Sequence, residues 1–177
     1  MVVLDLSEKP NFIRPELLLH PMIPRSLSGV NPRRIKGKEW WDKTRKAAYA
    51  ENNYCCWACG AHRMDTTEQL LDGHETYEYN FDKRTMRYEG TVALCRRCHE
   101  FIHFNTLSPP SRATRRLVSG IEYLRSVGIK PPYPQVTAAM YRGYGTQPVD
   151  AAEQKRIHSL LAKRWTLEFE HKLFKGR

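Results

Sequence analysis

Long apolar runs are missing from this 177-residue chain. No stretch approaches the roughly 18 uninterrupted apolar residues that a membrane-spanning helix needs, and the first residues lack the basic-then-apolar pattern of a signal peptide. The chain also has no internal repeat and no low-complexity tract. Hydrophobic residues nevertheless make up 41% of it, enough to bury a core. These features predict a soluble, cytosolic protein and exclude a membrane protein and a chain that is disordered throughout.

Acidic residues are outnumbered, because 19 Asp and Glu stand against 29 Lys and Arg, for a formal net charge of +10. An excess of this size predicts attraction to a polyanion, since the release of condensed counterions supplies an affinity that falls as salt rises. Nucleic acid, and DNA first, is the expected partner. The alternative is that the charge only keeps the protein soluble.

Two C-x2-C pairs account for four of the five cysteines. Each pair resembles a zinc knuckle, in which two thiolates of one tight turn occupy two corners of a tetrahedron. The alternatives, a disulfide pair or free buried thiols, fit a cytosolic protein less well. Cys55 is left over, since its use in place of Cys56 would open the spacing to C-x3-C. The expected ligands of one structural zinc ion are Cys56, Cys59, Cys95 and Cys98.

Prolines recur in the N-terminal part of the chain. Because proline removes amide donors and disfavours helix at the preceding residue, they predict an extended basic arm over residues 1–37. Helix-forming residues then predict a helix over 39–51. Between the two knuckles, alternating residues predict strands over 68–79 and 86–94 with a turn between them. After Cys98 the pattern becomes helical.

The C-terminal part is predicted to be mainly helical. Its expected elements are an amphipathic helix over 112–127, a loop-rich segment over 131–145, a helix over about 150–164 and a strand over 166–174. The predicted fold class is therefore α+β. Its expected parts are an extended Pro-rich basic arm (1–37), a zinc-binding core (38–107) and a helical basic extension that ends in a short strand (108–177).

Three histidines within the zinc-binding core form a candidate for a second metal site. His99 and His103 are four residues apart, so they project from one face of the predicted helix. His74 ends the first predicted strand, and a hairpin packed on that helix would bring it opposite the pair. Three protein ligands with open positions are typical of a catalytic metal. The alternative is ordinary packing beside the zinc site.

The segment 54–104 resembles the HNH, or ββα-metal, nuclease family in its four-cysteine form. The run Val92–His103, with the sequence VALCRRCHEFIH, is similar to that family's C-terminal signature, and the run Cys56–Gly60 is similar to its opening knuckle. The resemblance covers about 50 of the 177 residues. It implies a zinc-stapled ββα core and a metal-dependent hydrolysis of phosphodiester bonds in DNA.

Carried over by position, the resemblance makes His74 a metal ligand and Glu75 the general base, and gives His74, His99 and His103 as the ligands of a second divalent cation (Mg²⁺, Mn²⁺, Ni²⁺ or Zn²⁺). The sequence departs from the family in two places: the usual base is histidine, and Gly90 stands near the place of the family's middle asparagine. In a second register His74 is the base and Asp72, His99 and His103 hold the metal. We favour the first register because it keeps three nitrogen ligands.

The sequence is consistent with three functions, of which the third gives the histidines no role. The first is an HNH-type DNA endonuclease, in which the cysteines staple the fold and the histidines hold the catalytic metal. The second is a catalytically degenerate HNH-derived module that binds DNA or a protein. The third is a plain zinc-ribbon adaptor.

Basic residues on either side of the core are expected to contact phosphates of the nucleic acid. These residues are Arg33, Arg34, Lys36, Lys38, Arg112, Arg115 and Arg116.

Overall fold

The computed structural model describes residues 13–19, 23–66, 69–103, 107–129 and 151–177, and these form an α+β fold around a four-stranded sheet. The predicted loop over 131–145 lies outside the described residues. In chain order the elements are the short 3₁₀ helices η1 (Pro15–Leu19) and η2 (Arg25–Leu27), helices α1 (Pro32–Lys36) and α2 (Lys38–Glu51), η3 (Arg63–Asp65), strands β1 (Leu71–Asn80) and β2 (Thr85–Cys95), helices α3 (Arg96–Ile102), α4 (Pro110–Ser126) and α6 (Ala151–Ala162), and strands β3 (Thr166–Phe169) and β4 (Lys172–Lys175).

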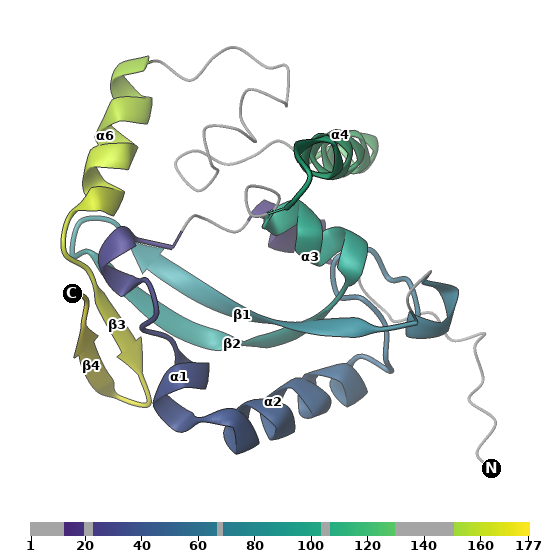
Figure 1. Ribbon diagram of the computed structural model, residues 1–177, viewed down its shortest axis with the longest axis horizontal. Coiled ribbons are helices and arrows are strands. Elements are labelled where there is room, and N and C mark those ends of the chain that lie inside the picture. Colours follow the sequence, from purple (N-terminus) through teal and green to yellow (C-terminus); the bar gives the residue numbers. More distant parts are fainter. Residues whose placement is uncertain (1–12, 20–22, 67–68, 104–106, 130–150) are drawn as a thin grey trace.

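A long antiparallel hairpin of β1 and β2 is the centre of the fold (Figure 1). Its register pairs His74 with Val92 and Glu75 with Thr91, with an irregularity between Thr76 and Tyr77. Because successive side chains of a strand point to opposite faces, His74 and Glu75 cannot lie on the same side of the hairpin. Helix α2 covers one face, and α3 with α4 lies on the other.

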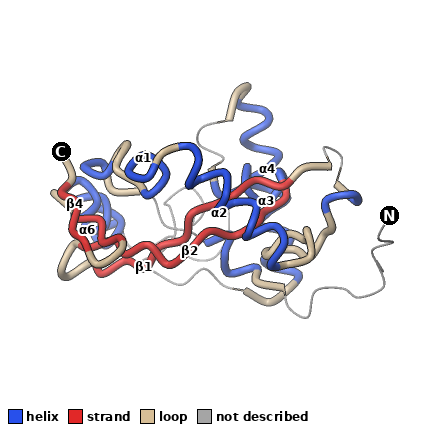
Figure 2. The backbone as a smooth tube through the Cα atoms, turned by 90° about the horizontal axis from the view of Figure 1, so that it is seen from below, coloured by secondary structure: helices blue, strands red, loops and turns tan. Residues whose placement is uncertain are grey.

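The α2 face of the hairpin is defined by a close approach at Gly73. A Cβ added to Gly73 would lie 2.9 Å from Cβ of Arg45 and 3.1 Å from the Trp41 ring, so only glycine lets the helix come this near. Figure 2, seen from below, shows α2 running along the hairpin. The predicted helix over 39–51 is confirmed by α2, and its close packing on the hairpin requires a residue without a side chain at Gly73.

The opposite face carries α3 and α4. Cys95 caps α3, and Cys98, Phe101 and Ile102 turn inward from it. Helix α4 crosses α3 closely, because a Cβ on Gly120 would lie 2.0 Å from the Phe101 ring. This packing gathers Val92, Leu94, Phe101 and Leu124 with the cysteines into one buried cluster.

The N-terminal segment is not the extended arm that its prolines predict. Three short helical turns lie within its described residues, and Pro32 opens α1 at a position where the missing amide costs nothing. Leu18 and Leu27, each 1% exposed, enter the two buried clusters of the molecule. The prolines thus define turns that fold the segment back onto the core. Its backbone joins the first knuckle through Arg14 N, which donates to the Trp57 carbonyl at 2.7 Å.

The C-terminal strand predicted over 166–174 is instead a tight hairpin of β3 and β4. Glu170 and His171 adopt φ values of 48° and 59° and reverse the chain between the two strands. Strand β3 pairs in parallel with the start of β2, which extends the sheet. Trp165, fully buried, anchors this junction among Tyr79, Phe81 and Met86. The predicted helix that precedes it corresponds to α6.

Among the helices that the described residues form, none combines the length and the apolar character needed to cross a membrane.

Candidate metal centres

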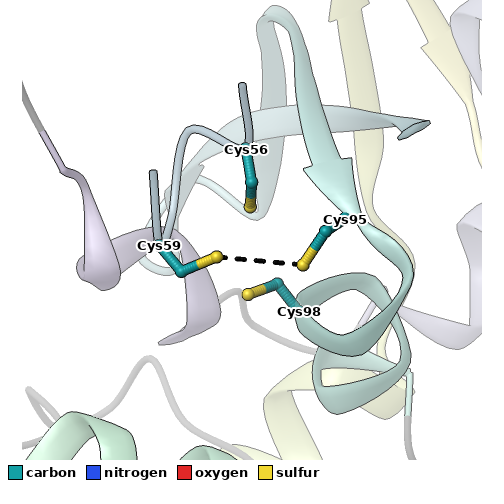
Figure 3. A group of neighbouring side chains, drawn as sticks. All are labelled: Cys56, Cys59, Cys95 and Cys98. Carbon is teal, nitrogen blue, oxygen red and sulfur yellow. Dashed lines mark hydrogen bonds between the residues drawn. The ribbon is translucent and has the colours of Figure 1, made fainter. Parts of the chain in front are cut away.

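Four cysteines converge at one end of the hairpin. Cys56 and Cys59 belong to the turn before β1, which a hydrogen bond from Gly60 N to the Cys56 carbonyl closes at 2.8 Å. Cys95 ends β2, and Cys98 lies in the first turn of α3. Figure 3 shows the four sulfur atoms pointing toward one another. The structure therefore brings together the set that the spacing predicts.

The geometry of this cluster fits a zinc ion. All four sulfur atoms lie within 4.8 Å of one another, and the Sγ atoms of Cys59 and Cys95 are 3.8 Å apart. Four thiolates about 2.3 Å from a tetrahedral zinc ion stand about 3.8 Å from each other. A disulfide would require a separation of about 2.05 Å. The cluster is thus a possible four-cysteine metal site, in which zinc is the ion that thiolate chemistry favours.

The four thiols share hydrogen bonds. Hydrogen bonding from the Cys56 thiol lowers the pKa of Cys59 and of Cys95, whereas hydrogen bonding to Cys59 raises the pKa of Cys56 and hydrogen bonding to Cys56 raises that of Cys98. Zinc binds the deprotonated thiol, so binding of zinc would release protons from this cluster. Cys55 lies apart from the set: its thiol is buried and 3.5 Å from the carbonyl of Asn53, and burial raises its pKa.

Three histidines converge further along the same hairpin and helix. His74 projects from β1, while His99 comes from α3 and His103 from the residue that caps it. One ring nitrogen from each lies within 4.8 Å of the other two, and Nε2 of His103 is 3.3 Å from Nδ1 of His74. Two imidazole nitrogens that ligate one tetrahedral ion at about 2.0–2.1 Å are about 3.3–3.4 Å apart. The histidine cluster can therefore hold a metal ion such as zinc.

A carboxylate orients one member of the histidine cluster. Oδ2 of Asp72 is 3.1 Å from Nδ1 of His99. This hydrogen bond lowers the pKa of Asp72, and the charge of Arg96 lowers it further. In metal sites the ring nitrogen that does not ligate usually donates to such a carboxylate, which fixes the tautomer. Among the described residues, the group of close candidate ligands contains His74 and not Asp72, so Asp72 contacts His99 rather than replacing His74 as a ligand, as it does in the second register.

The protonation state of His103 also suits a ligand. Burial of the ring lowers its pKa to about 4, and the neighbouring His99 contributes to the same shift. The imidazole is therefore neutral at neutral pH, as metal binding requires. Its inner edge faces His74 while the residue as a whole remains exposed, so the cluster opens to solvent on one side.

Glu75 is not brought to the histidine cluster. It follows His74 on β1 without an intervening bulge, so its side chain points to the α2 face of the hairpin. There its Oε1 accepts a hydrogen bond from the backbone N–H of Arg33 at 3.3 Å, and its charge contributes to the raised pKa of Tyr77, whose main cause is burial. The prediction that Glu75 is a general base next to a metal at His74 conflicts with this placement, because two successive residues of a regular strand point to opposite faces.

Gly90, which stands near the place of the family's asparagine, lies opposite Thr76 in the hairpin. A Cβ added there would meet nothing within 4 Å. The position therefore has room for a side chain but supplies no ligand.

The basic residues predicted to grip DNA occupy opposite faces of the hairpin. Arg33, Arg34 and Lys36 belong to α1 and Lys38 begins α2, on one side, whereas Arg112, Arg115 and Arg116 lie in α4 on the other (Figure 1). Several already have partners: the Arg33 guanidinium lies 5.2 Å from the Trp41 ring centroid, and Lys36 pairs with Glu170 at 3.0 Å. The two groups do not form one continuous surface.

Reasoning from the sequence missed a charged cluster between α3 and α4. Glu100, 6% exposed, pairs with Arg96 at 3.0 Å, with Arg116 at 2.7 Å and with Arg112. Burial alone would raise the pKa of Glu100, but hydrogen bonds from the three arginines lower it to about 2. The four-residue spacings of Arg96 and Glu100, and of Arg112 and Arg116, were the available signal.

Comparison of the chain with models of protein families, with curated proteins and with solved structures finds no match.

Proposed function

We propose that the protein is a metal-dependent endonuclease of the HNH type, which hydrolyses phosphodiester bonds in DNA. The observation that carries the proposal is the convergence of His74, His99 and His103 on the same hairpin and helix that assemble the cysteine cluster. The resemblance of the segment 54–104 to the four-cysteine HNH family supports the choice of reaction, and the net charge of +10 supports the choice of a polyanionic substrate.

The two clusters have different parts in this proposal. The cysteine cluster is closed by four sulfur ligands and holds the turn before β1 against the start of α3. The histidine cluster has three ligands and one open side, which is the arrangement that leaves room for a substrate oxygen and a water. A divalent cation held there supplies positive charge to a phosphate oxygen and lowers the pKa of a bound water.

The residues of the chain orient these groups. The contact between Asp72 and Nδ1 of His99 favours one orientation and one tautomer of that ring. His103 stays neutral at neutral pH and offers a lone pair. Glu75 has no part in this arrangement, since its carboxylate binds the backbone of Arg33 on the far face of β1.

Cleavage of supercoiled plasmid tests the proposal. The purified, zinc-loaded protein is incubated with plasmid and, in parallel, with added Mg²⁺, Mn²⁺, Ni²⁺, Co²⁺ or Zn²⁺. We expect nicked or linear product with the ions that imidazole nitrogen prefers, and weaker activity with Mg²⁺, which prefers oxygen ligands. The matched control is His103→Ala, which should produce neither nicked nor linear plasmid. Equal cleavage by wild type and His103→Ala would overturn the assignment of the site.

A second candidate function is supported by the place of Glu75 and by Gly90. If catalysis needs a base beside the metal and an asparagine on β2, this chain has neither in place. The protein would then be a zinc-stapled module that binds DNA or a protein. Wild-type protein that loads both clusters, binds a DNA duplex and leaves the plasmid intact with every cation would favour this function over the first.

A further inference from the structure

Glu100 brings three arginines together where one would balance its charge. Arg96 and Arg112 contact Oε1, Arg116 contacts Oε2, and Arg112 also reaches Oε2 at 3.4 Å. A buried carboxylate must be paired, and a single bidentate arginine is enough for that. Among the described residues, Glu100 is the one carboxylate within ion-pair distance of Arg112 and Arg116. The cluster therefore carries an excess of positive charge.

The arginines of this cluster are held rigidly and still reach solvent. The side chains of Arg96, Arg112 and Arg116 are 45%, 35% and 29% exposed, whereas Glu100 beneath them is 7% exposed. Each guanidinium has five N–H donors in a fixed plane, and the two oxygens of one carboxylate cannot accept from all of them. Guanidinium groups fixed in this way lose little conformational entropy when they bind a second anion.

The cluster lies beside the histidines. Arg96 stands three residues before His99 and four before Glu100, and His103 stands four and three residues after them, which places all four on one side of α3. Arg96 also acts on the Asp72 carboxyl that holds His99. The basic residues of α1, in contrast, lie on the far side of the hairpin.

We infer that Arg96, Arg112 and Arg116, arranged by Glu100, form a binding site for a backbone phosphate of the DNA strand whose scissile phosphate lies at the histidine cluster. This inference rests on the proposed function for the identity of the strand. Arg112 and Arg116 bind the phosphate oxygens directly, and Glu100 is a positioning residue that holds both guanidinium groups toward solvent. If Glu100 positions the arginines, then removal of its negative charge should weaken the binding of DNA, although DNA is itself a polyanion.

The test measures binding apart from cleavage. All proteins carry His103→Ala, and each is titrated against a fluorescein-labelled duplex of about 16 base pairs by anisotropy at several NaCl concentrations. The first variant is Glu100→Gln, with Glu122→Gln, an exposed position of α4, as its charge-matched control. The second is the pair Arg112→Lys and Arg116→Lys, which keeps the net charge and the contact with Glu100, with Arg125→Lys as its control. Zinc content and circular dichroism check the fold.

We expect Glu100→Gln to bind about tenfold more weakly than the parent, although it is more positive, and Glu122→Gln to bind as well or better. The double lysine variant should also lose about tenfold, because lysine cannot make the bidentate contact, while Arg125→Lys should lose little. A Glu100→Gln protein that binds more tightly, a lysine variant that matches its control, or a parent that does not bind the duplex would overturn the inference. If Glu100→Gln does not fold, the lysine variant decides.

Failure of this inference is separable from failure of the proposed function. Plasmid cleavage by the wild type together with unchanged binding by both variants would remove the phosphate site alone. Loss of binding by both variants together with an inactive wild type would remove the nuclease assignment and keep the site as part of a DNA-binding module.

Discussion

The cysteine and histidine clusters come from the same short stretch of chain and yet have opposite characters. Both use the start of β1 or the turn before it, and both use the segment 95–103. The cysteine cluster has four sulfur ligands, and Cys56 and Cys98 are 0% and 3% exposed. The histidine cluster offers three nitrogen atoms, from His74, which is buried, His99, which is partly buried, and His103, which is exposed as a residue. The comparison teaches that the number of candidate ligands and their exposure, within one helix and one hairpin, separate a closed cluster from one that is open to solvent.

The largest expected effect is loss of the fold on breaking the closed site. Cys95→Ser should abolish zinc binding at the cysteine cluster and unfold the hairpin and α3. Structural zinc contributes about 10–16 kcal/mol in small zinc domains, which matches or exceeds the whole stability of about 5–15 kcal/mol of an ordinary domain. Thermal denaturation followed by circular dichroism, with and without a chelator, measures this.

Cys55→Ser is the matched control for the closed site, because Cys55 is buried next to Cys56 but lies outside the cluster. We expect it to keep its zinc and to melt within a few degrees of the wild type. A cooperative, zinc-free fold in Cys95→Ser would show that the cluster is not structural.

The next effect concerns the open site, and it should be local. His103→Ala should remove the second metal and abolish plasmid cleavage while it leaves the cysteine-bound zinc and the melting temperature nearly unchanged, because the residue is exposed and caps the end of α3. Metal content per chain should fall from about two ions to about one. His62→Ala, a histidine in the turn after the first knuckle, is the control. A His103→Ala protein that loses both metals would mean that the two clusters are not independent.

The contrast between the clusters shows what the sequence could and could not reveal. The spacing of cysteines and of His99 and His103 is local, and the two strands and α2 appear within a few residues of their predicted bounds. That Glu75 and His74 lie on opposite faces follows from strand alternation, but the close approach of α2 to the face of Glu75 is a contact with Gly73 that no local pattern specifies.

Other features depended on contacts between distant segments. Leu18 and Leu27 became core residues only because the N-terminal turns fold back onto the sheet. The pairing of Glu100 with Arg112 and Arg116 required α4 to cross α3, which no local pattern specifies.

A smaller effect should follow from loosening the open site without removing a ligand. Asp72→Asn should weaken metal binding at the histidine cluster by about 10- to 100-fold, because the amide holds His99 less firmly than the carboxylate does. Isothermal titration with Zn²⁺ or Ni²⁺ on protein already loaded at the cysteines measures this. Asp82→Asn, in the turn of the hairpin, is the control and should not change the affinity. If Asp72→Asn binds Zn²⁺ or Ni²⁺ as tightly as the wild type, Asp72 does not support metal binding by His99.

The smallest expected effect is at Glu75. The HNH resemblance assigns the base to Glu75 and so predicts a loss of roughly 10²- to 10⁴-fold in Glu75→Gln. The structure puts this carboxylate on the α2 face, against Arg33, so we expect a loss of cleavage rate below about threefold. Initial rates of plasmid nicking, with metal content measured in parallel, distinguish the two. A large loss with the metal retained would require the hairpin to rearrange on binding DNA.

The parallel pairing of β2 with β3 has a consequence for how the chain is made. It joins Thr85–Arg87 to Thr166–Glu168, roughly 80 residues further along, which gives this part of the sheet a high contact order. The hairpin, α3 and the cysteine and histidine clusters belong to residues that leave the ribosome well before β3 does. In the interval the start of β2 is an unpaired strand edge, which can recruit another nascent chain and aggregate. The C-terminal hairpin, anchored by the buried Trp165, covers this strand edge when it joins the sheet.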